Sequence, residues 1–175
     1  MFRKKVSKVF IKGDRVVYPM YGAGIIVDLE DKMVDGQTST YYVLNIPINN
    51  LKIMVSVNNV ENAGLRPVLP SCELSEIIET AVECACFDNT NWNQRYRENL
   101  LKIKSGCLSE TASVFKALRR REKVKGLSSA EKKMLTTAKQ IILSEIILSF
   151  NVEKEDAENI LEVASEAQQT SEAKA

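Results

Sequence analysis

The 175-residue chain contains no histidine. Imidazole is the commonest metal ligand and the usual general base near neutral pH, so its absence excludes His-dependent catalytic triads and His-ligated metal sites. A glycine-rich phosphate loop is also missing, because the pair Gly22 and Gly24 is too short and precedes a predicted strand rather than a helix. Carboxylates in residues 73–83 recur at helical spacing with apolar residues between them, which is typical of a solvated helix face. We therefore predict that the protein is not an enzyme.

Cysteine is scarce and lacks a metal-binding pattern. Cys84 and Cys86 form the one close pair, whereas structural zinc normally requires two pairs with C-x₂₋₄-C spacing. We expect ordinary semi-buried thiols, no metal and no cofactor. Long hydrophobic runs are missing too, because IILSEIILSF is shorter than a membrane span and contains Glu145. The basic N-terminus lacks the apolar segment of a signal peptide, so a cytoplasmic protein with no membrane association is expected.

Charge is present in quantity and is segregated along the chain, although the net charge is only +1. Residues 92–139 contain 13 Lys/Arg and four Asp/Glu, whereas residues 71–91 contain no basic residue and residues 140–175 contain two. A basic segment between two acidic ones is typical of a protein that binds an anionic partner, although a run of charges can also be a solvated helix face. Lys and Arg side chains of this kind neutralise phosphates without reading base sequence.

Residues 1–70 have the alternation and the turn signals of short β-strands. Asp35-Gly36 predicts a hairpin turn, and Pro47 ends the strand that follows it. Four or five short strands are predicted, in the segments RVVY, IIVDLEDKMV, YYVLNI, LKIMVSV and GLRPV. So many short strands in about 60 residues predict a small β-barrel or curled sheet that protects its own edges.

Residues 71–167 have helical periodicity, with a domain boundary near Leu69-Pro70 and a frayed tail at 168–175. Ser128 and Glu131 have the spacing of a capping box. Helices are predicted over residues 73–86, from Trp92 with Thr90 or Asn91 as N-cap, from Ser109 to Lys125, from the capping box onward, and over 153–166. The fourth is apolar almost all round, so it should be central in a bundle. The fold class is therefore α+β in two domains, β first and all-α second.

Trp92 is the one tryptophan, and it lies between two asparagines at the start of a predicted helix. On a helical wheel it shares a stripe with Tyr96, Leu100 and Ile103, so it could extend the core. An aromatic side chain at a helix end beside arginines can instead act as a wedge or a stacking plate on DNA bases. Spacing alone leaves both interpretations open.

Several segments carry a family resemblance that runs through both domains, from about Phe10 to Ala164. KGDRVVYPMYGAGIIVDLE, GQTSTYYVLNIP, VSVNNVENAGLRPV, NWNQRYRENLLKIKSG and GLSSAEKKMLTTAKQIILSE together resemble the CarD/CdnL family of bacterial transcription regulators. The resemblance implies a Tudor-like (SH3-like) domain in residues 1–70, with 1–9 as an extension, that docks on the RNA polymerase β subunit. It implies a helical domain in 71–167 that binds promoter DNA at the upstream edge of the transcription bubble. There the family's tryptophan enters the minor groove and helps to keep the promoter open. The protein is expected to act as a monomer.

The resemblance also implies roles for individual residues. Trp92 matches the wedge tryptophan, Arg95 and Arg97 match basic residues beside it, and Lys132 matches a lysine that contacts the DNA backbone. Arg119, on the basic third helix, is a further DNA-binding candidate.

Lys32, Met54 and Tyr42 are the candidate polymerase contacts. Met54 stands where some members of the family have an arginine. Tyr21 replaces a histidine that is common in the turn after Tyr18-Pro19. The polar pairing at the docking surface is therefore expected to differ from that of those members. Two other functions stay open. One is an adaptor that docks on polymerase or another protein without using DNA, and the other is an RNA-binding protein with an SH3-like barrel.

Overall fold

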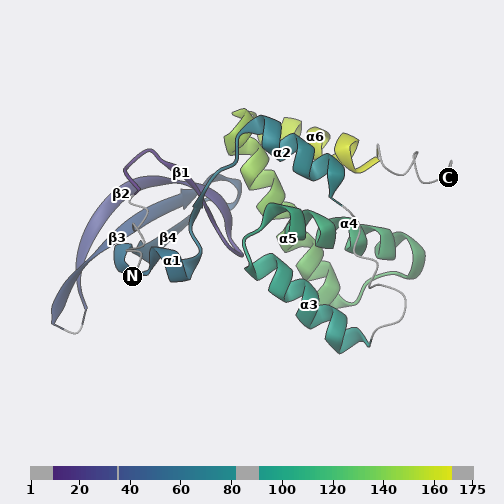
Figure 1. The fold of residues 1–175 in the computed structure, drawn as a ribbon, viewed down its shortest axis with the longest axis horizontal. Helices are drawn as coiled ribbons and strands as arrows, with labels where there is room; N and C mark the ends of the chain where they lie inside the picture. The colour runs from purple at the N-terminus through teal and green to yellow at the C-terminus, as the bar shows by residue number, and fades with distance from the viewer. Residues whose placement is uncertain (1–9, 35, 82–90, 167–175) are drawn as a thin grey trace, which may run out of the picture.

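The computed structural model of the protein describes residues 10–34, 36–81 and 91–166. An antiparallel sheet forms one side of the molecule and a group of helices forms the other (Figure 1). The β2–β3 hairpin projects away from the helices, so its tip and the first turn of α3 lie at opposite ends of the molecule (Figure 1). The predicted α+β class, with the sheet first in the chain, is confirmed.

In the described residues the sheet has five strands, where four or five were predicted, in the order β4-β3-β2-β1-β5. They are β1 Arg15–Tyr18, β2 Gly22–Val34, β3 Gln37–Ile46, β4 Leu51–Ser56 and β5 Arg66–Pro67. The register between β2 and β3 shifts between Ile26 and Asp28, and such a bulge bends a strand and increases its twist. Two short 3₁₀ turns, Pro47–Asn49 and Val57–Asn59, and the helix α1, Val60–Ala63, lie in connections where no helix was expected.

Tyr42 belongs to the core of the sheet domain, which corrects its assignment as a polymerase contact. Its side chain is 1% exposed, and its hydroxyl accepts a hydrogen bond of 3.1 Å from the backbone N–H of Phe10. The Phe10 and Tyr42 rings meet edge to face, with centroids 6.1 Å apart. Tyr42 therefore holds Phe10, the first described residue, against β3, and its buried side chain offers no surface to a partner.

Five helices follow the sheet in the described part of the chain: α2 Ser71–Thr80, α3 Trp92–Lys104, α4 Leu108–Lys125, α5 Ser129–Phe150 and α6 Lys154–Glu166. Asn91 caps α3, since its side chain accepts a hydrogen bond of 3.1 Å from the N–H of Asn93. The capping box of Ser128 and Glu131 opens α5 as predicted. The expected cap of α4 at Ser109 is wrong, because Cys107 occupies that position. The rest of the helix expected over 73–86, with Cys84 and Cys86, lies outside the described residues, as does the tail.

The helical core is built around α5, as its nearly continuous apolar sequence predicted. Residues of α5 are buried on several faces, including Ile142, Leu143 and Ile146, each at most 2% exposed. Leu118 of α4 and Leu161 of α6 pack into the same cluster. Because α5 is surrounded in this way, its two ends are fixed in the fold: one meets α3, and the other meets the sheet.

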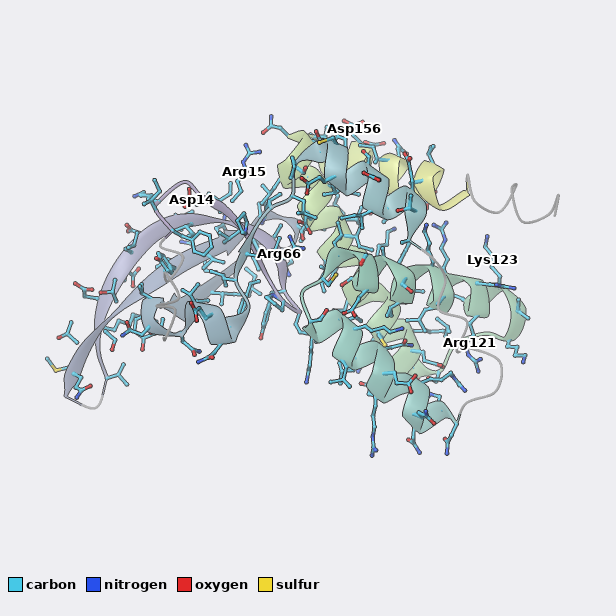
Figure 2. All side chains as sticks on the ribbon, in the orientation of Figure 1. Asp14, Arg15, Arg66, Arg121, Lys123 and Asp156 are labelled. Atoms are coloured by element: carbon cyan, nitrogen blue, oxygen red, sulfur yellow. The ribbon has the colours of Figure 1, made fainter. Side chains whose placement is uncertain are left out.

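A buried ion pair joins the sheet to α5. Glu145 is 0% exposed, and its two carboxylate oxygens accept hydrogen bonds of 2.6 and 2.8 Å from the guanidinium of Arg66 in β5. The same carboxylate accepts a hydrogen bond of 3.1 Å from the N–H of Leu69, and Arg66 also donates to the carbonyl of Gly106 at 2.9 Å. Figure 2 labels Arg66 where the sheet meets the helices.

A second set of contacts lies beside this ion pair, at the C-terminal half of α5. The N–H of Ala23 donates to the hydroxyl of Ser144 at 2.7 Å. Gly22 next to it has a φ of +102°, and a Cβ there would run into the Ser144 side chain. Arg15 of β1 donates to the carbonyl of Leu148. The helices are thus packed directly on the strands and not merely linked to them.

Candidate nucleic-acid interface

Trp92 lies at the surface, where the first turn of α3 meets the start of α5. Its side chain is 40% exposed, and its ring stacks on Tyr96 with centroids 5.5 Å apart and planes 20° apart. The indole N–H donates to the hydroxyl of Ser128, the N-cap of α5, at 3.3 Å. The predicted stripe continues inward to Ile103, which is 1% exposed. Trp92 is therefore the exposed end of a stripe whose middle, Tyr96 and Leu100, is half-buried and whose inner end is buried.

A carboxylate between two arginines lies behind Trp92. Glu131 is 5% exposed, and its Oε1 atom is 3.8 Å from Arg95 of α3 and 3.5 Å from Arg121 of α4. Burial acts to raise the pKa of Glu131, but hydrogen bonds from Ser128 and the positive charges of Arg121 and Arg95 outweigh it, so the pKa is lowered. The carboxylate is thus ionised near neutral pH, and the three side chains together carry one excess positive charge.

Arg95 was expected to contact DNA beside Trp92, but its side chain is turned into the protein. Its side chain is 11% exposed and points to Glu131, so it braces the site from within. Arg97, by contrast, is exposed on α3. Lys132 and its neighbour Lys133 are exposed in the first turn of α5. Within the described part of the chain, none of these last three forms an ion pair, so their charge is available to a partner.

Lys133 was not singled out by the family match, although it borders a groove that is also lined by Tyr96, the ring on which Trp92 stacks. This groove, about 460 Å³ in volume, runs between α3 and α5, with Tyr96 and Leu100 on one side and Met134 on the other. Lys132 borders a different groove, with Glu122 and Glu158, on another face of α5. The position of Lys133 in the first turn of a capped helix was the available sequence signal.

Arg119 is not brought to this face. Its guanidinium lies over the Phe115 ring, 5.9 Å from the centroid, and is 3.5 Å from Glu162 of α6. Two residues along a helix point roughly 200° apart, so Arg119 faces away from the side of α4 that presents Arg121 to Glu131. Figure 2 labels Arg121 at the end of α4.

Several basic side chains of residues 92–139 serve the fold instead of the surface. Lys116 is 7% exposed and donates to the carbonyl of Ala81 at 3.1 Å, which satisfies the C-terminal end of α2. Lys139 pairs with Glu158 at 3.7 Å. With Arg95, Arg119 and Arg121, at least five of the 13 basic residues make contacts within the protein. The charge that the surface offers is therefore smaller than the count in the sequence suggests.

The remaining candidate residues lie on the sheet. Lys32 is exposed near the tip of the β2–β3 hairpin, 4.0 Å from Glu30, and Met33 beside it is 78% exposed. Met54 is half-buried in β4 and pairs with Val43 of β3. Tyr21 is 46% exposed in the β1–β2 turn and stacks on Tyr18. Lys32 and Met54 thus remain accessible, whereas Tyr42 is not.

The described residues hold no group of three or more Cys, Asp or Glu side chains arranged to bind a metal ion. In the same part of the chain, no helix is long and apolar enough to cross a membrane.

Both domains match known families in the order that the fold presents them. Residues 10–69 match the CarD-like/TRCF RID domain, and residues 76–162 match the CarD C-terminal domain. Over 138 residues the chain is 36% identical to the Bacillus subtilis (strain 168) protein named "Putative transcription factor YdeB", an alignment that covers 79% of this chain and 90% of that protein. The chain combines an N-terminal RID-type domain with a C-terminal helical domain of the CarD type. It belongs to the CarD-like family, which confirms the resemblance seen in the sequence.

Proposed function

We propose that this protein docks on the β subunit of RNA polymerase through its sheet and stabilises the open promoter complex by inserting Trp92 into the DNA minor groove. One observation carries the proposal: Trp92 is 40% exposed at the junction of two helix starts that bear Arg97, Lys132 and Lys133. An apolar wedge flanked by groups that contact phosphates is the arrangement that minor-groove proteins use. The protein would act as a cytoplasmic monomer.

The energetics favour DNA that is already distorted. Inserting a side chain between base steps costs a few kcal/mol in unstacking, and this cost is smaller where the bases are unpaired. A ligand that prefers the open complex shifts the opening equilibrium by its differential affinity alone. A tenfold preference corresponds to about 1.4 kcal/mol. Trp92 therefore needs to act only at the edge of a bubble, without recognising a sequence.

The shape of the molecule supports a simultaneous contact with polymerase and DNA. Lys32 and Met33 lie near the hairpin tip, and Trp92 lies at the opposite end of the molecule (Figure 1). If the sheet holds the protein on polymerase, tethering raises the effective concentration of Trp92 at the promoter, so weak DNA affinity suffices. An adaptor without DNA contact is the alternative, and the internal use of at least five of the 13 basic residues favours it.

Photo-crosslinking separates the two functions. A photoreactive residue at Asn93, exposed beside Trp92, is expected to crosslink to promoter DNA at the upstream edge of the bubble in a polymerase complex. The matched control is the same residue at Val163, which is 69% exposed on the acidic helix α6 and should give no DNA adduct. Adducts from Asn93 to polymerase subunits alone would establish the adaptor and exclude the wedge.

Charge reversal should produce two distinct patterns of loss. Arg97→Glu and Lys132→Glu are expected to weaken DNA contact and shorten the lifetime of the promoter complex while polymerase binding is unchanged. Each lost phosphate contact lowers the slope of log K against log salt by about 0.9. Lys32→Glu should weaken polymerase binding instead. Arg95 is left intact because its reversal would break the Glu131 cluster. Identical patterns from the two classes of variant would contradict separate DNA and polymerase surfaces.

A further inference from the structure

The hydroxyl of Ser128 makes more hydrogen bonds than an N-cap requires. It accepts from the backbone N–H of Glu131 at 3.3 Å, and the backbone N–H of Ser128 donates to Oε2 of Glu131 at 3.0 Å, which completes the capping box. Beyond the capping box, the hydroxyl donates to the same Oε2 atom at 2.8 Å. It also accepts from the indole N–H of Trp92 at 3.3 Å. A hydroxyl has one donor and two acceptor sites, so all three sites are in use.

We propose that Ser128 is a positioning residue for Trp92: the N-cap hydroxyl of α5 holds the indole in the orientation in which it meets DNA. The Glu131 carboxylate accepts the hydrogen bond that the hydroxyl donates. The lone pairs of the hydroxyl oxygen are therefore left to accept from the backbone N–H and from the indole N–H. The orientation of the hydroxyl, and with it the second acceptor site, is thus set by a buried charge.

Arg95 and Arg121 complete this device. They contact the other oxygen of Glu131 from α3 and α4, so the cluster joins the starts of α3 and α5 to the end of α4. Arg95 is three residues after Trp92 on the same helix, which fixes the first turn of α3 relative to Ser128. Arg95 therefore contributes through Trp92 and not through a phosphate.

The functional consequence follows from preorganisation, and it rests on the wedge function proposed above. A free indole would lose rotamer entropy when it enters the groove, whereas one that is already stacked on Tyr96 and bonded to Ser128 loses less. The bond to Ser128 also keeps the indole N–H satisfied when the ring is buried among bases, where an unpaired donor would be unfavourable.

Two replacements of Ser128 separate this role from helix capping. Glycine is nearly as good an N-cap as serine, whereas alanine is clearly worse. Ser128→Gly therefore removes the indole acceptor but keeps α5 capped, and Ser128→Thr keeps both the cap and the acceptor. In both variants the melting temperature should change little.

Trp92 is the one tryptophan, so fluorescence anisotropy decay of the full-length protein reports its motion directly. In Ser128→Gly we expect a larger amplitude of fast indole motion and an open-complex lifetime about threefold to tenfold shorter, the range for one hydrogen bond. Ser128→Thr should restore both.

Two results would overturn the proposal. Either Ser128→Gly leaves the indole as restrained as in the wild type, or the indole is freed and the lifetime of the open complex does not change. Failure of the wedge function itself is recognised separately, because Trp92→Ala would then have no effect on opening, while the anisotropy would still report whether Ser128 restrains the indole.

Discussion

Trp92→Ala is expected to remove most of the effect on promoter opening and to leave the fold nearly intact. The side chain is 40% exposed and its contacts are to Tyr96 and Ser128 at the surface, so its loss creates no cavity. Truncating a core aromatic costs about 3–5 kcal/mol, because the removed atoms leave a void. The lifetime of the open complex and the melting temperature, measured on the same preparation, test both halves of this expectation.

Two matched variants calibrate the result. Leu101 is a 68% exposed apolar residue of the same helix, and Leu101→Ala should leave both stability and promoter opening unchanged. Phe115 is 3% exposed in the helical core, and Phe115→Ala should lower the melting temperature by many degrees. If Trp92→Ala behaves as Phe115→Ala does, Trp92 is a structural residue and the wedge is wrong.

Elements that depend on local chemistry could be read from the sequence. The strands follow from alternation and turn residues, and the start of α5 follows from Ser128 and Glu131 at capping-box spacing. Asn91 was one of two predicted caps for α3, and this capping role explains one of the two asparagines beside Trp92. The caps depend on residues that are at most four positions apart in the chain, so they can be predicted from the sequence alone.

Features that depend on distant residues could not be read in this way. A helical wheel assigns Trp92 to an apolar stripe, but whether the end of that stripe is covered depends on where α5 begins. The family resemblance and the charge pattern made Arg95 and Arg119 candidates, and Tyr42 was a candidate on the sheet. Their surroundings depend on Glu131, Glu162 and Phe10, which are 36, 43 and 32 residues away respectively. The partner of Glu145 is 79 residues away in the sheet.

The ion pair of Arg66 and Glu145 offers the largest expected effect on stability. Arg66→Ala would leave a 0% exposed carboxylate without its guanidinium, and breaking a buried pair in this way costs about 3–5 kcal/mol. Arg119→Ala is the matched control, because it removes an ion pair of the same type between partly exposed side chains and should cost at most about 1 kcal/mol.

Replacing both partners tests whether the ion pair stabilises the fold or mainly fixes its geometry. Arg66→Met combined with Glu145→Met removes the buried charge altogether, so we expect much of the lost stability to return, as for other buried pairs replaced by apolar residues. The N–H of Leu69 and the carbonyl of Gly106 would still lose their partners, so recovery should be incomplete.

The same variants also test how the sheet and the helices depend on each other. Because Arg66 and Glu145 belong to different domains, we expect thermal unfolding of Arg66→Ala to separate into two steps, with the sheet and the helices melting independently. Promoter opening should fall as well, since Trp92 would no longer be held at a fixed distance from the hairpin that we propose to dock on polymerase. Calorimetry and open-complex lifetimes measure the two effects. A single unfolding transition with unchanged stability and unchanged promoter opening would mean that the remaining contacts, such as those of Ser144 and Arg15, are sufficient to hold the domains together.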